Sequence, residues 1–101
     1  MKFKAFFNRD GGTFRTADMD AFTALAIAAF EGAGHAIAVQ VVGGNEIEPA
    51  MRAAAETGGI DGIIAGGGDG TISTAAGLAW RHGLVLGVVP VWAGAVGLAV
   101  D

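Results

Sequence analysis

Hydrophobic residues gather in four short runs along the chain, separated by segments in which apolar positions recur with a helical period. The four runs cover residues 3–7, 35–42, 60–65 and 84–89. Short runs that are rich in aromatic or β-branched side chains are typical of strands buried in a sheet. The pattern therefore predicts four strands.

Three helices are predicted between these strands, over residues 16–31, 46–57 and 71–82. Thr16 or Asp18 can cap the first helix, because a short polar side chain accepts a hydrogen bond from a free N–H at a helix start. Glycines follow each helix and supply its natural end. The side chains predicted to face the core from the first helix are Phe22, Leu25, Ala26, Ala29 and Phe30.

The alternation of strand and helix, with short connections, predicts the fold class. It favours an α/β fold of three layers (α/β/α) with a mostly parallel sheet and right-handed crossovers. Residues 93–100 are expected to add a short helix after the last strand. No linker or repeat interrupts the pattern, so residues 1–101 are predicted to form one domain.

Composition mainly excludes classes of protein. Hydrophobic residues make up 52% of the chain and charged residues 16%, which excludes a disordered chain. The six lysines and arginines are dispersed, which excludes nucleic acid as a partner through a basic patch. Cysteine is absent, so a disulfide framework and a thiolate metal site are excluded, and a cytoplasmic location fits best.

The segment of residues 83–100 has no charge and reaches the shortest length that can span a membrane. Pro90 lies in its middle, and the half before it is β-branched and strand-like. A buried strand is therefore predicted, and no transmembrane span is expected. The start of the chain leads into a strand-like run, so no signal peptide is expected either.

The run GGGDGT at residues 66–71 carries the candidate chemistry. It follows an apolar strand and opens a helix, at the sheet edge where ligands of α/β folds bind. Glycines let backbone N–H groups converge on an anion, and the helix N-terminus adds a positive dipole. The Thr71 hydroxyl can donate to a phosphate oxygen or cap the helix. The pattern favours phosphate binding, and the alternative is a tight strand–helix turn with Asp69 as its N-cap.

Asp69 is an anion and does not suit a direct phosphate contact. Its carboxylate is a candidate partner for Mg²⁺, or a candidate base on an attacking hydroxyl group. The other loops expected at the same edge of the sheet cover residues 8–13, 43–45 and 90–94. Glu46 and Glu48 are interpreted first as solvated charges at a helix start, and a position near the ligand edge is the alternative. Arg9 and Arg15 are either phosphate contacts or surface charges.

Residues 60–72 resemble the central motif of the diacylglycerol kinase catalytic domain family, which includes bacterial lipid kinases and sphingosine kinases. The string GGDG also occurs in NAD kinases. The run FFNRDGG at residues 6–12 is similar to the first strand and turn of the family, and residues 88–91 resemble the strand before its Pro-x-Gly-Thr-x-Asn motif. The resemblance implies the N-terminal, NAD kinase-like nucleotide-binding domain of such a kinase.

The resemblance implies ATP and Mg²⁺ as cofactors, with transfer of a phosphoryl group to a lipid hydroxyl in full-length relatives. It assigns Asp69 as the candidate catalytic residue and Mg²⁺ partner. The nucleotide-binding residues that it implies are Asn8, Gly66, Gly67, Gly68, Gly70 and Thr71.

Two departures from the family pattern change the expected function. Trp92-Ala93-Gly94-Ala95 stands where the family has Gly-Thr-x-Asn, and the sequence ends where the family continues into a β-rich domain. We therefore expect an isolated ATP-binding domain that is inactive alone. The alternatives are a non-catalytic, truncated or engineered domain that self-associates, and a remnant of NAD kinase type. A homodimer through the C-terminal segment is expected, because an edge strand offers unpaired backbone groups to a second copy.

Overall fold

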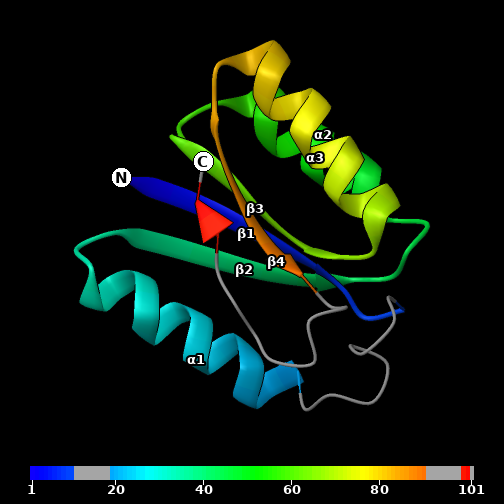
Figure 1. Cartoon of the computed structure of the whole chain (residues 1–101). Helices are drawn as coiled ribbons and strands as arrows, with labels where there is room; N and C mark the ends of the chain where they lie inside the picture. The colour runs from blue at the N-terminus through cyan, green and yellow to red at the C-terminus, as the bar shows by residue number, and fades with distance from the viewer. Residues whose placement is uncertain (11–18, 91–98, 101) are drawn as a thin grey trace.

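The structure is a computed structural model, and it describes residues 1–10, 19–90 and 99–100. Strands and helices alternate along the chain from β1 to β4, as Figure 1 shows, and a short fifth strand follows. They are β1 (Lys2–Asn8), α1 (Met19–Gly32), β2 (Ala36–Val42), α2 (Ile47–Thr57), β3 (Gly62–Gly67), α3 (Asp69–His82), β4 (Val85–Pro90) and β5 (Ala99–Val100).

The strands form one sheet in the order β2-β1-β3-β4-β5. The first four are parallel, and each neighbouring pair is in continuous register along its strands. Helix α1 covers one face, and α2 and α3 lie side by side over the other (Figure 1). The predicted three-layer α/β fold with a mostly parallel sheet is therefore confirmed.

The core on the α2 and α3 face is built from side chains of both helices and of alternate strand positions. Phe6 and Ile63 point to this face from β1 and β3, and Met51 and Leu78 meet them from the helices. All four side chains are almost completely buried. This larger core fixes the start of α3 against the end of β3, where the glycine motif lies.

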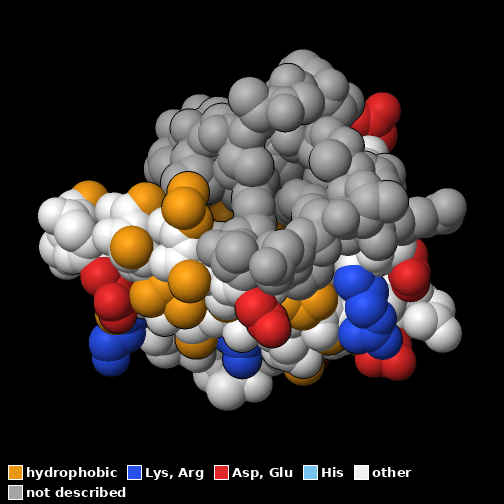
Figure 2. Space-filling view, turned by 90° about the horizontal axis from the view of Figure 1, so that it is seen from below, with side chains coloured by type: hydrophobic (Ala, Val, Ile, Leu, Met, Phe, Trp, Pro, Cys, Tyr) orange, Lys and Arg blue, Asp and Glu red, His pale blue; other side chains and the backbone are white. Residues whose placement is uncertain are grey.

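The core on the other face is built, among the described residues, from side chains of the sheet and of α1. Phe30 is buried and packs edge-to-face on the Phe3 ring, with 5.3 Å between ring centroids. Ala26 is buried beside it, whereas Leu25 keeps 69% of its surface exposed. The sequence prediction that Leu25 and Ala29 face the core is therefore wrong. The inward stripe runs through Thr23, Ala26, Ile27 and Phe30, and hydrophobic side chains remain exposed on this side of the molecule, seen from below in Figure 2.

The C-terminal segment also differs from its prediction. Residues 99–100 form β5, which pairs antiparallel with Gly87 and Val88 of β4, and they are not helical. The remaining positions of the predicted helix, 93–98, lie outside the described residues. β5 therefore occupies part of the outer edge of β4. The homodimer expected through this segment stays a prediction. Among the described residues, no helix has the length and apolar character needed to cross a membrane.

Candidate functional site

A cleft of about 360 Å³ opens at the carboxyl edge of the sheet. It lies between the end of β1, the loop that joins β2 to α2, and the start of α3. This is the edge at which open parallel sheets bind their ligands. The described residues that line it are Asn8, Gly44, Ile47, Glu48, Gly68, Gly70, Thr71 and Thr74.

Asn8 connects the two motifs that are far apart in the sequence. Its side-chain Nδ2 donates to Thr71 Oγ1 at 3.3 Å, and its Oδ1 accepts the backbone N–H of Asp10 at 2.9 Å. Thr71 is only 7% exposed, so its hydroxyl is held on the cleft wall and does not cap the helix. Two of the residues that the resemblance implied for nucleotide binding, Asn8 and Thr71, are therefore in direct contact.

The turn after β1 is tied to the loop after β2. The Asp10 carboxylate accepts the backbone N–H of Gly44 at 2.9 Å, and the Arg9 N–H donates to the Val42 carbonyl at 3.0 Å. The Arg9 guanidinium also lies beside Gly43. Sequence reasoning placed Asp10 in a turn and missed this role. The signal that could have found it is a short acid directly before two glycines at the end of a strand.

Gly66 and Gly67 belong to β3, which extends two residues farther than the sequence predicted. Gly67 pairs with Pro90 of β4, and neither Gly66 nor Gly67 lines the cleft. A Cβ on Gly67 would lie 2.9 Å from Thr71 Oγ1 and 3.2 Å from Asn8 Cβ. This glycine is therefore required by the close packing of β3, Asn8 and α3.

Helix α3 begins at Asp69, two residues earlier than predicted, so the glycine loop is reduced to Gly68. Gly68 is the N-cap of α3 and offers no side-chain cap, and a Cβ on Gly68 or Gly70 would meet no atom within 4 Å. The first N–H groups of a helix have no partner within the helix, and they carry its positive dipole. The cleft wall here is bare backbone with donors available to an anion.

Asp69 is exposed in the first turn of α3, next to the cleft but not among its lining residues. The alternative interpretation of Asp69 as an N-cap is wrong, because Gly68 holds that position. A carboxylate in a first turn interacts favourably with the helix dipole. Within the described residues, no group of three acidic, histidine or cysteine side chains could hold a metal ion.

Glu48 is the carboxylate that lines the cleft, from the first turn of α2. It forms an ion pair with Arg52 one turn later. The positive charge of Arg52 reduces the repulsion between the Glu48 carboxylate and an anionic ligand. Glu46 is the N-cap of α2, without a side-chain cap, and does not line the cleft. Arg15 and residues 91–94, which the sequence placed at this edge, lie outside the described residues.

Comparison with known protein families matches residues 2–95 to the diacylglycerol kinase catalytic domain. The match spans the four parallel strands and the three helices that carry the cleft. The chain therefore belongs to the diacylglycerol kinase catalytic domain family, as its GGDG motif implied. No curated protein matches the chain.

Proposed function

We propose that residues 1–101 form one domain that binds the phosphates of ATP in the cleft. The observation that carries this proposal is the bare N-terminus of α3, where Gly68 and Gly70 both line the cleft. Phosphates bind at such helix starts because several N–H groups and the helix dipole act together. The family of kinases to which the chain belongs supports a nucleoside triphosphate as the anion.

Asn8 and Thr71 complete the phosphate site in this proposal. The Thr71 hydroxyl accepts from Asn8 and keeps its own O–H to donate to a phosphate oxygen. The bond therefore orients the hydroxyl toward the ligand. The proposed nucleotide-binding set is then Asn8, Gly68, Gly70 and Thr71, while Gly66 and Gly67 act by shaping β3 against the helix.

Mg²⁺ is proposed to bind with the nucleotide. This ion takes oxygen ligands and is commonly held by one or two carboxylates together with substrate phosphates and water. Asp69 is an exposed carboxylate in the turn whose N-terminus faces the cleft, so it fits one such ligand. A bound Mg²⁺ would neutralise charge on the phosphates. The position of Asp69 also allows another role, in which its carboxylate acts as a base on the hydroxyl group of the acceptor.

The acceptor is proposed to be a lipid hydroxyl, as the family implies. Ile47 is the one large apolar side chain that the described residues contribute to the cleft. The described part of the cleft therefore suits a polar nucleotide better than a lipid chain. We propose that the lipid is held by other parts of the kinase, and that this domain supplies the nucleotide side of the reaction.

A titration of the chain with ATP and Mg²⁺, followed by amide NMR, tests the proposal. We expect saturable shifts at Gly44, Gly68 and Gly70, and a melting temperature that rises with ligand. Ligand at one hundred times Kd should stabilise the fold by about 2.7 kcal/mol. The proposal is refuted if the shifts spread over the surface without saturation. It is also refuted if they are confined to residues far from the cleft. Asp69→Asn should reduce the part of the affinity that depends on Mg²⁺.

A further inference from the structure

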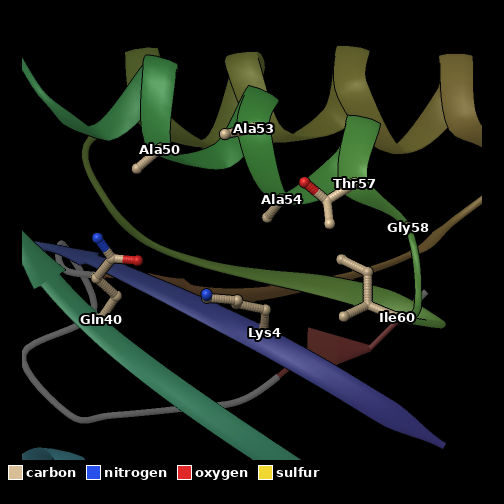
Figure 3. Close-up of a pocket in the computed structure, with 8 residues that line it drawn as sticks. All are labelled: Lys4, Gln40, Ala50, Ala53, Ala54, Thr57, Gly58 and Ile60. Atoms are coloured by element: carbon tan, nitrogen blue, oxygen red, sulfur yellow. The ribbon is translucent and has the colours of Figure 1, made fainter.

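A second hollow lies on the α2 face of the sheet, away from the cleft. Its volume is about 370 Å³, within the range of small-molecule sites, and it shares no lining residue with the cleft. We name it the α2 groove. Figure 3 shows the eight residues that line it: Lys4, Gln40, Ala50, Ala53, Ala54, Thr57, Gly58 and Ile60.

The α2 groove exists because α2 does not cover the edge of the sheet. Met51 and Ala55 hold the helix on the core between β1 and β3. Ala36, Ala38 and Gln40, at alternate positions of the edge strand β2, are left exposed. The wall of α2 that faces them is made of alanines, whose small side chains leave the space open. The result is an apolar wall along a strand edge.

Lys4 places a positive charge on the floor of this groove. Its side chain is partly buried, and its Nζ lies 5.9 Å from the centroid of the Phe6 ring, which fixes the ammonium by a cation–π contact. The ion pair found among the described residues joins Glu48 to Arg52 and does not involve Lys4. In Figure 3 the Lys4 ammonium extends along the floor toward the side of Gln40.

Within the described ranges Lys4 has no acidic ion-pair partner, which favours binding of an anion. The amide of Gln40 can donate a second hydrogen bond to it. Beyond these two groups and the Thr57 hydroxyl, the lining is apolar, mainly through Ala50, Ala54 and Ile60. We propose that the α2 groove binds a small amphiphilic anion, with its carboxylate or phosphate monoester on Lys4 and Gln40. Its short apolar body lies against the alanines of α2.

The proposal is tested by amide NMR titration with octanoate and with octyl phosphate, both below the concentration at which they form micelles. We expect saturable shifts at Gln40, Ala50, Ala54 and Thr57. Acetate and inorganic phosphate test the anion alone, and octanol tests the apolar body alone. Each should bind at least about tenfold more weakly than the amphiphile that combines them. Octyltrimethylammonium binding with equal affinity would overturn the proposal.

Lys4→Gln should weaken octanoate binding about tenfold, because it removes the charge and keeps a polar side chain of similar length. Lys2→Gln is the matched control, since Lys2 lies on the same strand and does not line the groove. It should bind as the parent does. Ala54→Leu should also weaken binding by filling the groove. If Lys4→Gln and Ala54→Leu keep the spectrum of the folded chain and bind octanoate unchanged, the proposal is wrong. The readout does not involve ATP, so it is independent of the function proposed above.

Discussion

Gly67 and Gly70 lie three positions apart in the motif and have opposite surroundings. A Cβ at Gly67 would lie 2.9 Å from Thr71 Oγ1 and 3.0 Å from Thr71 Cβ, whereas a Cβ at Gly70 meets nothing within 4 Å. We expect Gly67→Ala to lower the free energy of unfolding by about 1–3 kcal/mol, the usual cost of overpacking. Gly70→Ala should leave it unchanged or raise it by up to about 1 kcal/mol, because alanine favours the helix.

Urea denaturation of the two variants and the parent measures this difference. The two substitutions add the same methyl group to the same motif, so each serves as the control for the other. Equal effects of the two would contradict the described contact between β3 and α3. The contact also explains how one string of glycines serves two purposes: Gly67 permits packing, and Gly68 and Gly70 expose backbone to the cleft.

Among the described helices, α1 is the one that packs on the face of the sheet opposite α2 and α3, so its inward side chains carry a large share of the described packing there. Phe30→Ala should lower the free energy of unfolding by about 3–5 kcal/mol, the usual cost of removing a buried aromatic side chain. Leu25→Ala, on the exposed face of the same helix, should change it by less than about 0.5 kcal/mol. Chemical denaturation checks both values. A large loss for Leu25→Ala would show that another molecule or segment covers that face in solution.

The types of the first seven elements were predictable because the apolar runs and the helical periods between them are distinct, whereas the element bounds and the strand at residues 99–100 were not. The four apolar runs became the four parallel strands. In α1, by contrast, alanines and larger apolar residues surround the helix, so the pattern could not tell the stripe of Leu25 from that of Ala26. The start of α3 was missed because glycine suits both a loop and a helix N-cap, and only packing on β3 decides between them.

The candidate site was predictable only in outline. Parallel strands bring their carboxyl ends to one edge, so Asn8 and the glycine motif could be expected there together. Their hydrogen bond joins residues 63 positions apart, and no local pattern indicates it. The bond from Gly44 to Asp10 was missed for the same reason. The exclusion of Gly66 from the cleft follows from its strand pairing, which the sequence alone does not reveal.

At the scale of the whole molecule, the described part of the cleft at the carboxyl edge of the sheet is lined mainly by backbone and small polar groups. Trp92 stands where the resembling family has a glycine, and no lipid-sized apolar surface lines the described part of the cleft. We therefore expect these 101 residues to transfer no phosphate to diacylglycerol or sphingosine on their own. A radiolabelled ATP assay measures this transfer. Turnover above background that Asp69→Asn abolishes would contradict the expectation, and it would make Asp69 a catalytic residue of this chain.

The central claim is that the bare start of α3 binds the phosphates of ATP, and Gly68→Val tests it most directly. A Cβ at Gly68 meets no protein atom, and the backbone there is extended, so the variant should fold. Its side chain would occupy the space where a phosphate approaches. Gly77→Ala, at an open position farther along α3, is the matched control. Isothermal titration with ATP and Mg²⁺ should give the same affinity for the parent and for Gly77→Ala. Gly68→Val should bind ATP at least about tenfold more weakly, which is a loss of about 1.4 kcal/mol of binding free energy. Equal affinity for all three would contradict the claim.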